Sequence, residues 1–301
     1  MPVTPEALRF YNLGDLCSVN PVPAGFANES YRIGTTGGMF LYRIFHQQGM
    51  REIMFELRVM DILGAHSFPT AYPIARCDGS YVTSTKEGPV VIYEFIEGEH
   101  PLPDRNSVKQ VSRILATLNK LPVPSSLQKK NAVHIDECLK ITGEFRHARC
   151  QYPDIFKYFE EQTTYLEPFL RPALPEGIVH GDAFPENILS RNKKLAALVD
   201  FEEACTDHLL FDVGIGMNAF CFIRNKPDAS LMKLFLKEYR AVREISEIER
   251  EALPYYIQWG AHGMILWHLR HLLNRRHTLQ EARVRELLTR VQYMRKHKPQ
   301  F

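Results

Sequence analysis

The sequence predicts an α+β protein with two lobes, a strand-rich one over residues 1–95 and a helical one over residues 96–301. Its length of 301 residues corresponds to about two domains, or to one domain with two lobes. Segments rich in Val, Ile, Tyr and Phe are concentrated in the first third, and helical spacing of apolar residues prevails in the remainder. An apolar content of 45% with 24% charged residues is ordinary for a globular protein that buries a core.

The first lobe is predicted to contain one helix and five strands. Residues 51–65 carry Ile53, Leu57 and Met60 on one helical face, which predicts an amphipathic helix. The strands are short runs of β-branched and aromatic residues separated by Gly, Asn or Pro, and the first three are expected to be antiparallel. The predicted strands are residues 17–24, 29–36, 39–45, 72–77 and 89–95.

The second lobe begins after a Pro-rich break at residues 100–104 and is predicted to be mostly helical. Residues 209–296 are expected to form one helix after another. An earlier helix is predicted from a stripe of four apolar residues, Val108, Val111, Leu115 and Leu118.

Residues 178–201 are the exception, because they show no helical period. Two short strands are predicted there, at residues 188–189 and 195–199, around a polar Arg-Asn-Lys-Lys turn. Polar loops on a helical scaffold are where catalytic residues usually lie. This segment is therefore the first place to look for a catalytic site.

Composition excludes several classes of protein. A net charge of +2 gives no sign of a nucleic-acid partner. No run of eighteen apolar residues exists, so we expect no transmembrane helix and no membrane partner, and the N-terminal residues do not resemble a secretory signal. The cysteines are too scattered for a C-x-x-C pair or a zinc site, and we interpret them as reduced thiols of a cytoplasmic protein. They are Cys17, Cys77, Cys138, Cys150, Cys205 and Cys221.

One constellation in residues 178–201 predicts phosphoryl transfer from ATP. His180-Gly181-Asp182 is followed by Asn187 five residues after the aspartate and by Asp200 thirteen residues later. Phosphoryl transfer needs a carboxylate that accepts the proton of the attacking hydroxyl, which suits Asp182. It also needs oxygen ligands for Mg²⁺, which suit Asn187 and Asp200. Asp182 and Asn187 fall on one loop and Asp200 at the end of the next hairpin, so the three residues are expected in one cleft. Five fixed letters give on the order of 10⁻⁴ chance matches in a chain of this length, so the pattern is specific.

The segments HGDAFPEN and VDFE resemble the motif of the aminoglycoside phosphotransferase and choline kinase superfamily. The resemblance implies a bilobal protein-kinase-like fold, with a nucleotide-binding first lobe and a catalytic and substrate-binding second lobe. It implies ATP and Mg²⁺ as cofactors and a small-molecule hydroxyl as acceptor. Under it Asp182 is the catalytic base, Asn187 and Asp200 are the Mg²⁺ ligands, and His180 packs the catalytic loop.

The first lobe carries further parts of the resemblance. The segment from Gly25 to Tyr31 is similar to the nucleotide-positioning loop, so Gly25 and Asn28 would bind nucleotide; an ordinary hairpin turn is the alternative. Arg43 stands where kinases usually carry a Lys that contacts phosphates, and Glu56 would be its acidic partner. A surface charge on a strand and a solvated helix face are the alternatives for these two residues.

Two more segments fit the same family. VIYEFIEG resembles the hinge between the lobes, where backbone groups around Glu94, Phe95 and Ile96 would hold adenine. Asp212 resembles the aspartate that braces the catalytic loop from the start of a helix. An acidic residue that simply favours the helix N-terminus would look the same in the sequence.

Within the superfamily, residues 204–222 and 239–254 resemble the homoserine kinases of this fold. The chain departs from those enzymes at Arg43, at the pair 202–203, where they have aromatic residues, and at Asn119, where many members have His. The expected substrate is therefore homoserine or a related hydroxyamino acid or amino alcohol. An aminoglycoside, choline or ethanolamine phosphotransferase, a small protein kinase and a non-catalytic nucleotide-binding pseudokinase remain alternatives.

The charge of the second lobe indicates which class of acceptor is expected. Residues 201–301 carry 16 Lys and Arg against 12 Asp and Glu, which disfavours a polycationic antibiotic. An amino acid needs a cation for its carboxylate and an anion for its ammonium. The candidates are Arg270 or Arg224 for the first role and Glu202, Glu203 or Asp207 for the second, with Trp267 as an aromatic contact.

Trp267 belongs to a helical stretch that also carries Trp259, His262 and His268. This aromatic and His set could line the acceptor site, and packing of an apolar helix into the core is the alternative. The sequence leaves the oligomeric state open.

Overall fold

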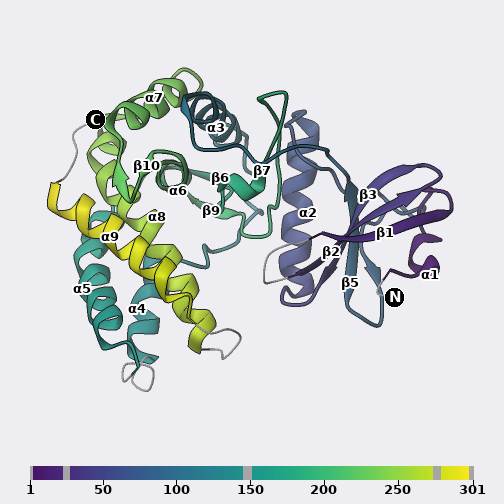
Figure 1. Ribbon diagram of the computed structural model, residues 1–301, viewed down its shortest axis with the longest axis horizontal. Helices are drawn as coiled ribbons and strands as arrows, with labels where there is room; N and C mark the ends of the chain where they lie inside the picture. The colour runs from purple at the N-terminus through teal and green to yellow at the C-terminus, as the bar shows by residue number, and fades with distance from the viewer. Residues whose placement is uncertain (1–2, 23–27, 145–150, 274–278, 298–301) are drawn as a thin grey trace. The chain divides into compact units, whose positions relative to one another are not determined.

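The computed structural model describes residues 3–22, 28–144, 151–273 and 279–297 (Figure 1). The chain divides into two compact units. The N-terminal unit comprises Met1–Glu99, Leu189–Asn192 and Ala196–Glu202, and the C-terminal unit comprises His100–Ile188, Lys193–Leu195 and Glu203–Phe301. Each unit is described by itself below.

The N-terminal unit contains a five-stranded antiparallel sheet in the order β1-β2-β3-β5-β4 (Figure 1). The three predicted antiparallel strands, the predicted helix and the apolar strand that follows are confirmed. The elements are α1 (Pro5–Leu8), β1 (Leu16–Val22), β2 (Asn28–Thr35), β3 (Gly38–Phe45), α2 (Met50–Ala65), β4 (Thr83–Ser84) and β5 (Pro89–Glu94).

The prediction of a strand over residues 72–77 is wrong. This segment makes only an isolated bridge between Pro73 and Tyr93, flanked by two backbone hydrogen bonds to β5. Proline has no N–H to donate, so the segment cannot continue a ladder along β5. The short strand β4, which the sequence did not indicate, pairs with β5 at Val90 and Pro89 instead.

The central strands β3 and β5 are buried on both faces. Tyr42, Ile44, Val90 and Ile92 pack with α1 on one face, and the alternate residues pack against α2 on the other. Since side chains alternate along a strand, Arg43 lies on the α2 face together with Phe45, Val91 and Tyr93. The pleat therefore places a guanidinium in a layer that consists mostly of apolar side chains.

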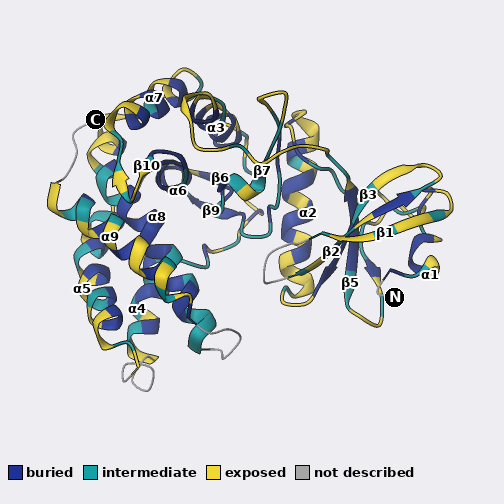
Figure 2. Ribbon diagram, viewed as in Figure 1, coloured by how far each residue is buried: buried dark blue, intermediate teal, exposed yellow. Residues whose placement is uncertain are grey.

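The C-terminal unit is built from helices, as predicted. Its central helix, α6, is buried along almost its whole length, and α8 packs against it (Figure 2). At their crossing a Cβ on Gly214 would lie 2.3 Å from the Tyr256 carbonyl oxygen, so only glycine fits. The helices are α3 (Arg105–Leu118), α4 (Ile135–Glu144), α5 (Pro153–Leu170), α6 (Leu210–Phe220), α7 (Ala229–Arg240), α8 (Glu247–Leu273) and α9 (Glu281–His297).

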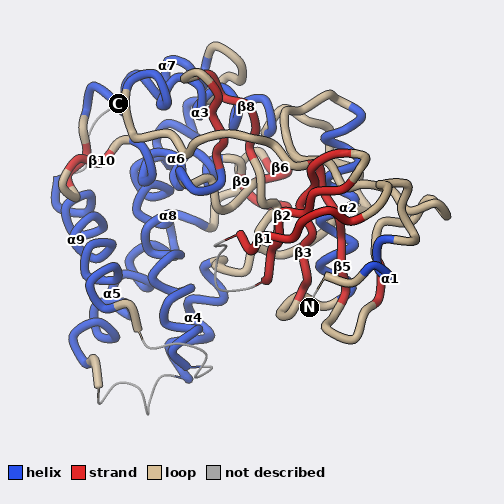
Figure 3. Tube along the Cα trace, turned by 45° about the vertical axis from the view of Figure 1, so that its right-hand side comes forward, coloured by secondary structure: helices blue, strands red, loops and turns tan. Residues whose placement is uncertain are grey.

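Short strands interrupt the helices (Figure 3). β6 (Glu176–Val179) pairs antiparallel with β9 (Cys205–His208), and the hairpin of β10 (Phe222–Ile223) and β11 (Lys226–Pro227) was not expected. The two strands predicted around the polar turn are confirmed as β7 (Ile188–Arg191) and β8 (Lys194–Leu198). Asn192 and Lys193 at that turn both have positive φ, of 51° and 60°, as a two-residue hairpin turn requires.

Across the described parts of the chain, no helix combines the length and apolarity that crossing a membrane requires. The five described cysteines are free thiols, as expected; Cys138, Cys205 and Cys221 are buried, and Cys17 and Cys77 are exposed. Cys150 lies outside the described residues.

Candidate active site

The predicted catalytic loop follows β6 in the C-terminal unit. Gly181 has φ 78°, and a Cβ there would lie 3.1 Å from the Glu203 carbonyl oxygen, so the sharp turn needs glycine. The Asp182 N–H donates to His180 Nδ1 at 3.2 Å, and the Phe184 N–H donates to the Asp182 carbonyl at 2.8 Å. A 3₁₀ turn, η2 (Pro185–Asn187), then reverses the chain.

This reversal brings the predicted base and one predicted metal ligand together. Asn187 Nδ2 donates to the carbonyl oxygen of Asp182 at 2.8 Å and to its carboxylate Oδ2 at 2.7 Å. Both side chains are half-buried. The two bonds orient the Asp182 carboxylate, and they leave the Asn187 amide oxygen as the atom that a cation could use.

Asp212 braces the catalytic loop from the first turn of α6. Its Oδ2 accepts from the His180 N–H and its Oδ1 from the Gly181 N–H, both at 2.9 Å, and Asn119 Nδ2 donates to Oδ2 at 3.1 Å. Burial raises the pKa of Asp212 to about 6, while these three hydrogen bonds work in the opposite direction. The expectation that Asp212 holds the loop is therefore confirmed, in a residue that also stands at a helix start.

The other predicted metal ligand, Asp200, lies in the N-terminal unit and is ion-paired with Arg43. Arg43 Nη1 and Nη2 donate to the two Asp200 carboxylate oxygens at 2.9 and 3.3 Å. Asp200 has φ 68°, a left-handed conformation that Asp tolerates better than most residues. Burial alone would lower the pKa of Arg43, but the charges of Asp200, Glu202 and Glu56 raise it, so the guanidinium stays charged.

Glu56 lies on the buried face of α2. The Tyr93 hydroxyl donates to Glu56 Oε1 at 2.8 Å, and burial together with this carboxylate raises the pKa of Tyr93 well above its usual value. The Glu56 charge acts on Arg43 across the same layer. A solvated helix face, the alternative for Glu56, is excluded because the residue is 3% exposed.

Asn28 and Glu202 are hydrogen-bonded to each other, although the sequence predicts nucleotide binding for Asn28 and acceptor binding for Glu202. Asn28 Nδ2 donates to Glu202 Oε2 at 2.5 Å, and Gln48 Nε2 donates to the same oxygen at 3.0 Å. The Asn28 amide oxygen accepts from the His46 N–H at 3.2 Å. Gln48 had no signal in the sequence beyond a short polar run after β3. Gly25 lies outside the described residues.

The predicted hinge residues follow the end of β5. The Glu94 N–H donates to the Tyr72 carbonyl at 2.8 Å, and the Glu94 carboxylate accepts from the Tyr72 N–H at 3.3 Å. The Arg32 guanidinium lies 5.7 Å from the centre of the Phe95 ring, and Ile96 is half-buried.

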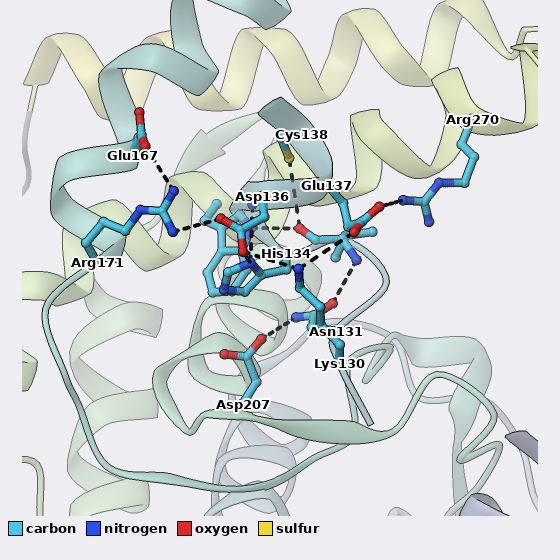
Figure 4. Close-up of polar contacts among 12 residues, drawn as sticks. Lys130, Asn131, His134, Asp136, Glu137, Cys138, Glu167, Arg171, Asp207 and Arg270 are labelled. Atoms are coloured by element: carbon cyan, nitrogen blue, oxygen red, sulfur yellow. Dashed lines mark hydrogen bonds and ion pairs between the residues drawn. The ribbon is translucent and has the colours of Figure 1, made fainter. Parts of the chain in front are cut away.

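The acceptor candidates of the C-terminal unit occupy different environments (Figure 4). Asp207 is buried, accepts from Asn131 Nδ2 at 2.8 Å and from the His208 N–H at 2.6 Å, and burial raises its pKa. Arg270, in contrast, is 27% exposed and pairs with Glu137 at 3.7 Å. Both environments border residues 130–138, a segment in which the sequence indicated no site residue.

The aromatic and His residues of α8 also occupy different environments, some in the core and one half-buried. Trp259 donates its indole N–H to the Val133 carbonyl at 3.1 Å, and His262 bonds to Thr163 Oγ1 at 2.9 Å, with its pKa lowered to about 3 by burial. Core packing, the alternative, is thus confirmed for these two residues. The half-buried Trp267 packs against His271, with ring centres 3.8 Å apart, and against His268.

Comparison with known proteins shows which family the chain resembles. The model of the phosphotransferase enzyme family matches residues 18–245. A homoserine kinase of Brucella anthropi is 28% identical over 271 residues, covering 89% of this chain and 83% of that protein.

Solved structures share the fold. A microcompartment-associated aminopropanol kinase superposes with a TM-score of 0.74 at 18% identity, covering 96% of this chain and 93% of that one. A spectinomycin phosphotransferase gives 0.68 at 16% identity, covering 97% and 95%. The predicted α+β, protein-kinase-like fold is confirmed. The chain therefore belongs to the phosphotransferase enzyme family and is a small-molecule kinase that transfers phosphate to a hydroxyl group.

Proposed function

We propose that the protein is an ATP- and Mg²⁺-dependent kinase of homoserine or of a closely related hydroxyamino acid or amino alcohol. The observation that carries the chemistry is the Asp182 carboxylate, oriented by Asn187 on a loop that Asp212 holds at two backbone N–H groups. The acceptor class is supported by similarity to homoserine kinases across 89% of the chain.

Asp182 is the base in this proposal. An ionised carboxylate accepts the proton of the acceptor hydroxyl as the oxygen attacks phosphorus, and its orientation decides how well it reaches that proton. The bonds from Asn187 to the carbonyl and the carboxylate of Asp182 restrict that orientation. Neither bond uses the Asn187 amide oxygen.

The residues present fit Mg²⁺ and a nucleotide. When bound, Mg²⁺ would neutralise phosphate charge, and Asn187 and Asp200 offer the hard oxygen atoms that it prefers. Arg43 Nε is buried without a hydrogen-bond partner in the described chain, so this N–H is a donor that a phosphate oxygen could use.

Further nucleotide-binding roles are proposed for Gly25, Asn28 and Glu56 and for the hinge residues Glu94, Phe95 and Ile96. For the acceptor we propose Arg270 as the cation that meets a carboxylate, because it is partly exposed and its ion pair within the described part of the chain is a 3.7 Å contact with Glu137. Trp267 lies three residues earlier on the same helix. Glu202 and Asp207 are the candidate anions. Asp207 is the weaker candidate, since burial raises its pKa and so disfavours the ionised form that an ammonium group needs.

The test is an assay coupled to ADP release, run on homoserine, other hydroxyamino acids, aminopropanol, ethanolamine, choline and aminoglycosides. We expect the highest kcat/KM for homoserine or a close relative, and large losses for its methyl ester and its N-acetyl derivative. Each charge-assisted hydrogen bond removed should cost about 1.5–3 kcal/mol. If kanamycin or choline is the best substrate, the acceptor is wrong and the phosphotransferase activity stands.

A second arm of the assay tests the base. Asp182→Asn should lower kcat by several orders of magnitude, with little change in nucleotide affinity, because the base acts on the acceptor rather than on the nucleotide. A variant that keeps more than about a tenth of wild-type turnover would remove Asp182 from the mechanism.

A further inference from the structure

A line of buried polar side chains leads from the catalytic loop to the start of α8. Asn119, the C-cap residue of α3, donates to Asp212 at 3.1 Å and accepts from the Tyr239 hydroxyl on α7 at 2.8 Å. Arg243 Nη1 donates to that hydroxyl oxygen at 3.4 Å, and its Nη2 pairs with Glu249 Oε1 at 2.7 Å. All five side chains belong to the C-terminal unit.

The hydrogen bonds of this line have a fixed direction. An amide oxygen only accepts, so the Tyr239 hydroxyl must donate to Asn119 Oδ1 and can then accept from Arg243. Asn119 Nδ2 in turn donates to Asp212 and to the Ile178 carbonyl, the latter at 3.1 Å. Donors therefore point from the guanidinium toward the Asp212 carboxylate, and each bond polarises the next.

Burying these polar side chains costs desolvation free energy. Tyr239 and Asp212 are fully buried, and Asn119 and Glu249 are 5% and 2% exposed. Apolar side chains of similar volume would fill the space without the desolvation of polar groups.

We propose that Asn119 and Tyr239 are positioning residues for phosphoryl transfer. They act through Asp212: the Asn119 amide fixes the carboxylate, the carboxylate fixes the N–H groups of His180 and Gly181, and that turn sets the position of Asp182. The inference rests on the proposed role of Asp182 as base. Arg243 and Glu249 hold the far end of the line.

The test compares Tyr239→Phe with Tyr256→Phe. The first removes the hydroxyl that orients Asn119. The second removes the hydroxyl of an equally buried tyrosine of the same unit. That hydroxyl is bonded to His208 Nδ1 at 2.5 Å, and no hydrogen bond among the described side chains connects it to the catalytic loop. Assays use the best acceptor from the screen, well below the melting midpoint of each variant. Tyr239→Phe should lower kcat about tenfold to a hundredfold with KM for ATP unchanged, and Tyr256→Phe should leave both unchanged.

A double-mutant cycle decides whether the effect passes through Asp212. If it does, Tyr239→Phe lowers kcat in the wild type but adds no further loss in an Asp212→Asn background. Losses that multiply, a loss confined to KM, or an equal loss in Tyr256→Phe would each overturn the proposal. Asp182→Asn is assayed in parallel, so failure of the proposed base is seen separately from failure of the line.

Discussion

Replacing Asp212 with Asn should change how stability depends on pH. Burial raises the pKa of Asp212 from 3.8 to about 6, a shift of roughly two units. Each unit corresponds to about 1.4 kcal/mol, so keeping this carboxylate ionised in the folded state costs about 3 kcal/mol relative to the unfolded chain. The cost falls on the residue that holds the catalytic loop, and Asn, being neutral at every pH, does not bear it.

Proton binding to Asp212 determines whether its contribution to stability rises or falls with pH. Between pH 3.8 and about 6 the folded protein holds a proton on Asp212 that the unfolded chain has released. The contribution of this group to stability is therefore complete below the unfolded pKa and is lost as the pH rises through the folded one. Relative to the wild type, Asp212→Asn should gain up to about 3 kcal/mol in free energy of unfolding between pH 4 and pH 7.

Urea unfolding of both proteins at half-unit pH steps measures this difference in free energy of unfolding. The two proteins can be compared directly if the free energy of unfolding falls with urea concentration at the same slope in both. Contributions from other titrating groups are common to both proteins and cancel. Losing one carboxylate oxygen as acceptor shifts the variant's stability by a pH-independent amount, about 1–3 kcal/mol, and leaves the trend intact. A difference that is flat across this pH range, or that falls as the pH rises, would refute the reasoning.

Two further outcomes are expected. Asp200→Ala should abolish Mg²⁺-dependent ATP binding and Asn187→Ala should weaken it, because these two residues are the proposed protein ligands of the metal; unchanged calorimetric titrations of Mg·ATP would contradict both. Gly214→Ala should lower the free energy of unfolding by more than about 2 kcal/mol, because the added Cβ meets the Tyr256 carbonyl, which cannot move aside. Gly143→Ala on α4, where a Cβ meets no atom of the described residues within 4 Å, is the matched control and should be neutral or slightly stabilising.

The sequence was informative wherever a local pattern determines the structure. Short runs of β-branched and aromatic residues predicted β1, β2 and β3, and a 3.6-residue stripe predicted α2. The spacing of His180, Asp182 and Asn187 predicted a loop that the structure closes with hydrogen bonds. The error over residues 72–77 had a local cause as well, because one proline outweighed the β propensity of its neighbours.

Pairings between distant residues could not be predicted. Arg43 and Asp200 are 157 residues apart, and Asn119 and Tyr239 are 120 apart, so no spacing in the sequence connects them. The environments of Arg270 and Asp207 also differ for reasons of tertiary structure. One meets a partly exposed carboxylate, and the other is enclosed by Asn131 and a backbone N–H. Charge alone indicated Arg270 as a cation for a carboxylate and Asp207 as an anion for an ammonium, and it gave no information on these environments.

The catalytic loop is thus held by a group that destabilises the fold at neutral pH. A neutral side chain at position 212 would relieve the desolvation cost, but it offers one acceptor oxygen where two backbone N–H groups and the Asn119 amide need acceptors. An ionised carboxylate accepts from all three donors at once, and only while it stays ionised. The donors that converge on it from Asn119 and, through Tyr239, from Arg243 favour that charged form. Stability and positioning therefore oppose each other at this residue, and a substitution that strengthens the fold here should weaken catalysis.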